Sequence, residues 1–292
     1  MYNSIYNLKQ EFKQATILNR IIYINIAAFI LLSIIDMFSF LFQFNNSPLL
    51  NKLYLPANII SLVKQPWSII SYMFLHNGLL HILFNMIWLH FAGKIFLQHL
   101  NGKQLLTTYI LGGISGGFVF ILAYNYIPIF QGLSSNASAV GASASVLAIM
   151  IAIATYAPKY AVQFPFLGFV KLKYIAIFII TIDLLSIPNS NAGGHLAHIG
   201  GAIFGYIYIT QIKKGKDYSI AFFNFLELLI NTFKVRKKLK NTNKRPKSDY
   251  TFNSERSNKQ KEIDKILEKI AKSGYDSLNK TEKAALFNAS KK

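Results

Sequence analysis

The amino-acid sequence predicts an all-α, polytopic membrane protein, a six-transmembrane-helix bundle followed by a small helical cytoplasmic C-terminal module. Of its 292 residues, 52% are hydrophobic and only 15% are charged, which is too apolar for an ordinary soluble domain. Its apolar stretches recur at lengths near the roughly 20 residues that a bilayer requires. The net charge of +19 is concentrated outside those stretches. The chain has no cysteine, which excludes disulfides and thiolate metal sites.

Six apolar stretches are candidate spans, each with edges defined to within a few positions. The first is longer than the apolar core of a signal peptide, and no small-x-small cleavage pattern follows it. We therefore expect it to remain as a transmembrane helix. The six candidates are 21–44, 72–98, 104–124, 138–157, 171–187 and 195–212.

The orientation of the predicted bundle follows from its lysines and arginines. Basic residues occur in the leading tail 1–20, beside the second and fourth connections, and throughout the tail that follows the last span. The third and fifth connections, 125–137 and 188–194, contain none. Since basic residues favour the cytoplasmic side, both termini are expected in the cytoplasm, and the first, third and fifth connections are expected outside.

The tail beyond the last span divides into two parts. Within 213–262, the stretch 218–233 is expected to be an amphipathic helix in the membrane interface, followed by a basic run, 234–247, and a flexible linker. The basic run has eight Lys or Arg and no acid, but no recognition motif accompanies it, so we predict no nucleic-acid partner. The predicted divisions are a cytoplasmic tail 1–20, a transmembrane core 21–212, the segment 213–262 and a helical module 263–292.

Unusual polar residues recur in the first turns of three spans. The second span has His81 and Asn85, four apart and on one helix face; the fourth has Ser143; the sixth has His195 and His198. All three spans run inward from the outer side, and the serine lies roughly 8 Å from the start of its span at 1.5 Å per residue. Polar groups inside a membrane usually face a protein interior or a water-filled cavity. Their common depth therefore predicts a common cavity.

Small residues at four-residue intervals predict that the fourth and sixth spans pack closely, since such rows let helix backbones approach. This packing would bring Ser143 and His198 within hydrogen-bond range, the minimal arrangement for an activated serine nucleophile. The small residues are Ala144, Ala148 and Ala152 in one span, and Ala197, Gly201 and Gly205 in the other.

Other interpretations of these residues remain open. A serine or asparagine in a membrane helix often serves only as a hydrogen bond between helices. Trp67, in the first connection, is typical of an interfacial aromatic anchor. A metal transporter or metal-dependent enzyme could use four histidines, but the chain has no HExxH motif and few carboxylates in its apolar stretches, chiefly Asp36 and Asp183. The four are His76, His81, His195 and His198.

The motifs HNGLLHILFN, GAS and AHIGGAIFG resemble, in this order, those of the rhomboid intramembrane serine proteases, and the resemblance covers roughly residues 60–212. It implies a serine endopeptidase that cuts membrane-anchored proteins within or near a transmembrane segment, using Ser143 as nucleophile and His198 as general base, without a third, acidic member. Asn85, His81 and the Ser143 backbone N–H would stabilise the oxyanion. Packing or supporting roles would fall to Gly141, Gly201, His195 and Trp67.

The resemblance also implies partners and a location. The partners would be transmembrane protein substrates and the lipid bilayer; no cofactor or metal is expected, and the oligomeric state is left open. The location would be the bacterial inner (cell) membrane, and the C-terminal module resembles a short tail on some bacterial rhomboid-like proteins. The alternative is a catalytically inactive rhomboid-like protein that binds client transmembrane helices. That alternative usually lacks the serine or the histidine, and both are present here.

Three positions depart from the family pattern. Ala144 replaces the glycine after the serine, which adds a methyl group to a tight helix junction. Ser68 follows Trp67 where many members have arginine, and Leu147 stands where several members place an aromatic ring beside the histidine. None of these changes removes a group that would perform the chemistry.

Overall fold

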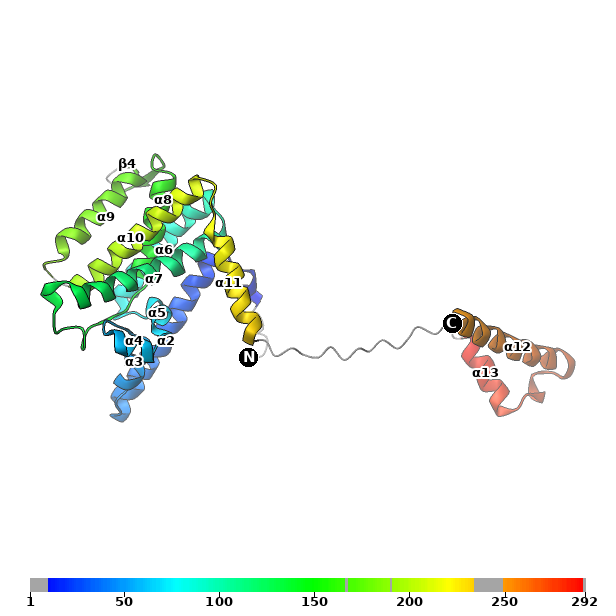
Figure 1. Cartoon of the computed structure of the whole chain (residues 1–292). Coiled ribbons are helices and arrows are strands. Elements are labelled where there is room, and N and C mark those ends of the chain that lie inside the picture. The colour runs from blue at the N-terminus through cyan, green and yellow to red at the C-terminus, as the bar shows by residue number, and fades with distance from the viewer. Residues whose placement is uncertain (1–9, 166–167, 190, 234–248, 291–292) are drawn as a thin grey trace. The chain divides into compact units, whose positions relative to one another are not determined.

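The computed structural model describes residues 10–165, 168–189, 191–233 and 249–290. The chain forms two compact units, Met1–Phe233 and Lys234–Lys292, and each is described by itself (Figure 1). The described residues are mostly helical, as the sequence predicts. The basic run 234–247 and the first part of the leading tail, 1–9, lie outside the described residues.

The first unit consists of long helices joined by short helical turns and two small sheets. Its longer helices are α2 (Ile17–Phe42), α6 (Leu79–His99), α7 (Gly102–Tyr126), α8 (Ser143–Tyr156), α9 (Leu172–Ser186), α10 (Ala192–Lys213) and α11 (Tyr218–Phe233). Its shorter elements are α3 (Ser47–Leu53), β1 (Leu55–Pro56), α4 (Ile59–Lys64), α5 (Ser68–Ser71), η1 (Tyr72–Phe74), η2 (Pro128–Phe130), β2 (Ser138–Ala139), β3 (Ala161–Phe164) and β4 (Gly168–Lys171).

Helix α8 lies at the centre of this unit, in contact with α6, α7, α9 and α10 (Figure 1). Its neighbours approach so closely because glycines face its alanines. A Cβ atom at Gly112 of α7 would lie 2.3 Å from the Ala148 Cβ, and one at Gly205 of α10 would lie 2.2 Å from the Ala148 carbonyl oxygen. The expected close packing of the fourth and sixth spans is therefore present as contact between α8 and α10.

Among the described residues, three helices are long and apolar enough to cross a membrane: α2, α6 and α7. Helix α8 is apolar but shorter, at 14 residues. Large apolar side chains lie exposed on the outer faces of these helices; examples are Leu31 at 59% and Phe118 at 57% exposure. Such faces suit a lipid environment, because in water they would form an extensive apolar patch.

Two spans begin later than the sequence predicts. Helix α6 starts at Leu79 rather than near residue 72, because Gly78 adopts a positive φ of 95° that interrupts the helical path. Helix α8 starts at Ser143 rather than near residue 138, because Gly141 has a φ of 128° and the residues before it form strand β2. β2 pairs antiparallel with β1, with Leu55 opposite Ala139.

The segment before α9 forms an antiparallel hairpin that the sequence analysis did not predict. Strand β3 pairs with β4, and Ala161 lies opposite Lys171. The alternating exposure of β3 shows that only one of its faces packs against the bundle. The hairpin lengthens the connection between α8 and α9 without adding to either helix.

Helix α11 is fastened to the bundle at its first turn by Asp217. The carboxylate accepts hydrogen bonds from the Ser219 backbone N–H at 2.8 Å, the Gln104 amide at 2.8 Å and the Tyr208 hydroxyl at 3.1 Å. Burial raises the pKa of Asp217, but these hydrogen bonds lower it by more, so its pKa lies below the ordinary 3.8. Asp217 thus caps α11 and joins it to α7 and α10.

The second unit consists of α12 (Asp249–Ser273), η3 (Tyr275–Ser277) and α13 (Lys280–Ser290). Helix α12 begins well before residue 263, so it includes residues that the sequence analysis placed in the flexible linker. Gly274, with a φ of 75°, follows the last residue of α12. The start of α13 is capped by Asn279, whose side chain accepts from the Glu282 N–H at 2.8 Å. Lys269 pairs with Glu282 at 2.9 Å and joins the two helices.

Candidate active site

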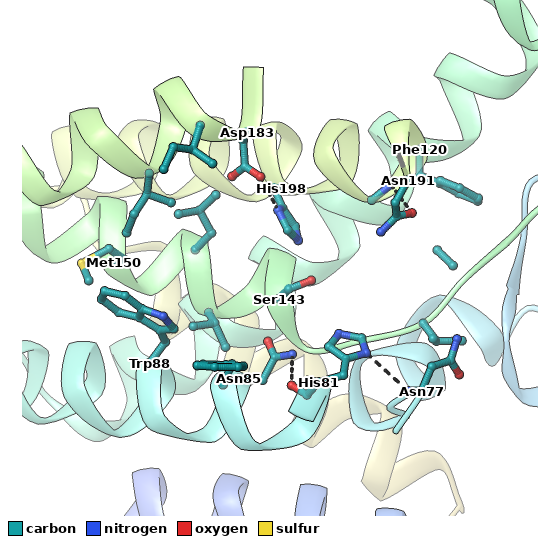
Figure 2. A pocket seen from close by; sticks show the side chains of 18 of the residues that line it. Asn77, His81, Asn85, Trp88, Phe120, Ser143, Met150, Asp183, Asn191 and His198 are labelled. Carbon is teal, nitrogen blue, oxygen red and sulfur yellow. Dashed lines mark hydrogen bonds and ion pairs between the residues drawn. The ribbon is translucent and has the colours of Figure 1, made fainter. Parts of the chain in front are cut away.

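A cavity of about 790 Å³ opens between α6, α8, α9 and α10. Ser143, His198, His81 and Asn85 all line it, and Figure 2 shows their side chains directed toward its interior. Apolar side chains such as Trp88 form much of the rest of its wall, together with polar ones such as Asn77 and Asn191. The structure therefore brings together residues from three helices whose common depth the sequence indicates.

Ser143 is the first residue of α8, rather than lying a turn and a half inside its span. The first backbone N–H groups of a helix have no intrahelical acceptor, and they carry the positive end of the helix dipole. The serine hydroxyl thus lies beside free backbone donors. Gly141 allows the close turn before it: a Cβ there would lie 2.9 Å from the His81 ring, and its φ of 128° disfavours any side chain.

The hydrogen bond at Nδ1 determines which nitrogen of His81 carries its proton. The Asn77 backbone N–H donates to His81 Nδ1 at 3.3 Å, so a neutral ring carries its proton on Nε2. Asn85, 6% exposed, donates one amide hydrogen to the His81 carbonyl oxygen at 2.8 Å and retains a second. Both side chains therefore have a donor available on the cavity side opposite His198 (Figure 2).

His198 is held by a carboxylate that the sequence analysis did not assign to the site. Asp183, on α9, lies with its Oδ1 atom 2.8 Å from His198 Nδ1 and 2.7 Å from His195 Nδ1. In Figure 2 the His198 ring lies between Asp183 and Ser143. The resemblance implies no acidic member, but the structure places one in direct contact with the histidine. The isolation of Asp183 in a largely apolar segment is the sequence signal that could have identified this acid as a site residue.

Within the described part of the chain, no hydrogen bond joins Ser143 to His198. Both side chains line the same cavity, and they belong to helices in backbone contact. Catalytic hydrogen bonds are often long in the absence of substrate and shorten when it binds. The observed arrangement therefore places the hydroxyl and the imidazole in one pocket, without a direct bond.

The contact between α8 and α10 is closest just below the serine. A Cβ at Gly201 would lie only 2.1 Å from the Ala144 carbonyl oxygen. The Ala144 methyl group packs toward α7, where a Cβ at Gly116 would lie 2.5 Å from it. The alanine that departs from the family pattern is thus accommodated by a glycine on the neighbouring helix.

All four predicted supporting residues lie outside the cavity lining: Trp67, His195, Gly141 and Gly201. Trp67 is 52% exposed and donates from Nε1 to the Lys52 carbonyl oxygen at 2.8 Å, so it braces the first connection. His195 contacts the site through Asp183 and through the edge of the His198 ring, with the ring centroids 5.9 Å apart. His76 lies behind His81, with the ring centroids 5.1 Å apart, and neither of its ring nitrogens has a hydrogen-bond partner among the described residues.

One cluster in the described part of the chain has donors that could bind a metal ion. The ligand atoms of Asp183, His195 and His198 all lie within 4.8 Å of one another. However, the two Nδ1–Oδ1 distances of 2.7 and 2.8 Å are hydrogen-bond lengths. Two ligands of one tetrahedral zinc ion lie about 3.3 Å apart, given bond lengths near 2.0 Å. The present geometry therefore favours protonated Nδ1 atoms over metal ligation.

The fold and the cavity define a polytopic helical membrane protein whose helices enclose a serine, a histidine and hydrogen-bond donors. A family model described as Rhomboid domain matches residues 63–214, which is slightly more than half of the chain. The chain therefore belongs to the rhomboid family. A second model, described as a family of unknown function (DUF6576), matches residues 248–292, which include all of α12 and α13.

Individual relatives agree with this assignment. The chain is similar to RHOMBOID-like protein 12, mitochondrial, of Arabidopsis thaliana, with 31% identity over 159 residues, 51% of this chain and 47% of the relative. It is also similar to Rhomboid protease GlpG of Yersinia pseudotuberculosis, with 30% identity over 148 residues, 49% of this chain and 47% of the relative. The chain thus spans about half the length of the curated relatives it matches.

Proposed function

We propose that this chain is an intramembrane serine endopeptidase that cleaves membrane-anchored proteins within or near their transmembrane segments. The observation that carries the proposal is the cavity itself, where Ser143 and His198 stand on one side of a space and the donors of His81 and Asn85 stand on the other. The relative named as a rhomboid protease supports the same activity.

In this proposal, catalysis begins with attack by the Ser143 hydroxyl on the scissile carbonyl carbon. A bond forms between Oγ and carbon, the Oγ proton passes to His198 Nε2, and the carbonyl oxygen becomes negative. The His81 and Asn85 side chains and the Ser143 backbone N–H donate hydrogen bonds to that oxygen. When the carbon–nitrogen bond breaks, His198 gives its proton to the leaving amine and an acyl ester remains on Ser143.

Water then completes the reaction in the same site. It attacks the ester carbon, gives a proton to His198, and forms a second tetrahedral intermediate. When the carbon–Oγ bond breaks, the proton returns to Ser143 and the carboxylic acid product leaves. Water must reach the pocket, so the site is proposed to lie near the outer membrane face. The substrate helix must unwind locally, because its helical hydrogen bonds otherwise occupy the carbonyl groups.

The proposed topology has six spans: α2, α6, α7, α8, α9 and α10, with both termini in the cytoplasm. Helix α8 is about 21 Å long at 1.5 Å per residue, shorter than the roughly 30 Å hydrocarbon core. Its start at Ser143 is therefore placed below the outer surface. Non-helical backbone at that depth is tolerated where it lines a cavity, as Ser138, Ala139 and Val140 do.

The same proposal covers location and partners. The protein is placed in a bacterial inner (cell) membrane, with transmembrane proteins as substrates and α11 in the interface plane. The second unit, α12 to α13, is proposed to be a cytoplasmic module joined through the segment 213–262. The long apolar helices and the family membership support integration into a membrane.

The decisive experiment compares Ser143→Ala with Ser145→Ala in purified full-length protein. Ser145 is on the same helix, fully buried, and its hydroxyl has no hydrogen-bond partner among the described residues, so its loss should leave activity unchanged. We expect the wild type and Ser145→Ala to cut a reporter transmembrane substrate and to react with a fluorophosphonate. Ser143→Ala should do neither, with a rate loss of at least about 10³-fold.

Each other outcome would contradict a different part of the proposal. Continued cleavage by Ser143→Ala would refute the assignment of the nucleophile. Inhibition by a chelator, without fluorophosphonate labelling, would indicate metal chemistry. Capture of client helices with no new fragment after long incubation would indicate the inactive, helix-binding alternative.

A further inference from the structure

Asp183 is a buried acid with no role in the dyad that the resemblance implies. It is 6% exposed, and it is the only charged side chain of α9 after Lys173. A carboxylate within an apolar helix is costly and usually has a functional partner. Here that partner is a pair of histidines on α10, one turn apart, whose Nδ1 atoms share the Oδ1 atom of Asp183.

The shared contact determines the tautomer of both rings. An ionised carboxylate accepts hydrogen bonds but does not donate them, so each Nδ1 must carry a hydrogen. A neutral imidazole has one N–H group, and therefore Nε2 of His198 is left as an acceptor. His198 lines the cavity with Ser143, and Nε2 is the only ring nitrogen free to take the serine proton.

We propose that Asp183 is a positioning residue for His198, which it orients and keeps in the tautomer that a general base needs, while His195 braces the carboxylate from the next turn. This inference rests on the proposed function. The site then operates as Ser143, His198 and Asp183 in sequence, although Asp183 touches neither the substrate nor the serine. As His198 becomes an imidazolium during attack, the negative carboxylate also stabilises the new positive charge and itself stays ionised.

His195 differs from His198 in what it touches. Both rings contact Asp183, but only His198 lines the cavity. Two hydrogen bonds from successive turns of α10 to the same oxygen hold the carboxylate more firmly than a single bond would. The link also joins α9 to α10 across the cavity wall.

The titratable groups around His198 come from several elements. Asp183 faces it from α9 and His195 from its own helix. His81 on α6 and Tyr124 on α7 line the same cavity, and α8 contributes no acidic or basic side chain to it. Asp183 is thus the one negative group facing the ring among the described residues.

The test measures kcat and KM for the full-length wild type, Asp183→Asn, Asp183→Glu and Asp36→Asn. Asp36 is a matched control, an acid on α2 that lines a different cavity. We expect Asp183→Asn to lower kcat about 10²- to 10⁴-fold with little change in KM. Asp183→Glu keeps the carboxylate and should recover part of the lost kcat, and Asp36→Asn should change nothing.

A second measurement does not depend on activity or on the folding of an Asp183 variant. In ¹⁵N-histidine spectra of the wild type at neutral pH, His198, assigned by its loss in His198→Gln, should carry its proton on Nδ1. A proton on Nε2 would overturn the inference, as would a wild-type kcat in Asp183→Asn. A change in KM rather than in kcat would reduce Asp183 to a structural role and also overturn it. Failure of the proposed function is distinct, because the wild type itself would then cut nothing or Ser143→Ala would still cut.

Discussion

Replacing Gly201 with alanine tests whether the α8–α10 contact sets the geometry of the site. The new Cβ would lie 2.1 Å from the Ala144 carbonyl oxygen. That oxygen belongs to the backbone of a central helix, so it cannot move aside as a flexible side chain would. Ala144 follows the serine directly, and Gly201 lies one turn from His198. The strain therefore acts on the two elements that hold the proposed catalytic pair.

The required movement follows from the contact distance. Ordinary van der Waals contact begins near 3.4 Å, so relief from 2.1 Å separates the helices by about 1.3 Å. Overpacking of this kind typically lowers the free energy of unfolding by about 1–3 kcal/mol. A displacement of about 1 Å at reacting groups typically lowers the rate about 10²-fold. We therefore expect a folded but destabilised protein with about 1% of the wild-type kcat.

Gly205→Ala is the matched control, because its Cβ would lie 2.2 Å from the Ala148 carbonyl oxygen. Its strain is nearly the same, but it acts about 6 Å further along the helix from the reacting groups. Thermal unfolding in detergent should show similar losses of stability for both variants, whereas reporter cleavage should fall more in Gly201→Ala. Wild-type stability in Gly201→Ala, or equal rate losses in the two variants, would refute the reasoning.

Two further predictions concern the oxyanion donors and the helix junction. Asn85→Ala removes one donor and should lower kcat of reporter cleavage about 10²- to 10³-fold with little change in KM, whereas a wild-type rate would exclude Asn85 from the oxyanion site. Asp217 has a pKa below 3.8, so its contribution to stability is present above that pH and is lost as the pH falls through its folded-state pKa. The melting temperature of Asp217→Asn should therefore lie below that of the wild type at neutral pH and converge with it in acid, and a constant difference would contradict this.

The sequence predicts the cavity residues well because helical spacing and burial constrain them together. Polar residues in the first turns of three apolar helices have few places to go except a common interior. Small residues at four-residue intervals also indicate which helices pack closely together. Ser143, His198, His81 and Asn85 therefore reach one cavity in the structure, as their shared depth indicates.

The sequence does not predict contacts that depend on the rotation of a helix about its axis. Asp183 is visible as a lone acid in an apolar stretch, but nothing local indicates that α9 turns it toward α10. The sequence also predicts the start of α8 too early, near residue 138 rather than at Ser143. Residues 138–142 are small and apolar enough to continue a helix, and only the positive φ of Gly141 and the pairing of β2 with β1 prevent this.

Local sequence patterns also fail to predict the β3–β4 hairpin and the early start of α12. The hairpin of β3 and β4 is short, and its strands are stabilised mainly by each other and by the bundle below. Helix α12 begins in a strongly polar stretch, where a hydrophobic pattern gives no indication of structure. Its helical residues instead include many with good intrinsic helix propensity, such as Lys, Glu and Gln.

The methyl group of Ala148 on α8 occupies the volume that a side chain at Gly112 on α7 would need. What the fold constrains at this junction is the sum of two side chains on neighbouring helices, not the identity of either. A glycine at position 148 would leave space for an alanine at position 112, whose other neighbours would lie at ordinary contact distances of 3.7 and 3.9 Å, so the exchange should be silent when both changes occur together. Divergence in this part of the bundle should therefore proceed by coupled pairs, and an aligned position that looks aberrant alone becomes ordinary beside its partner.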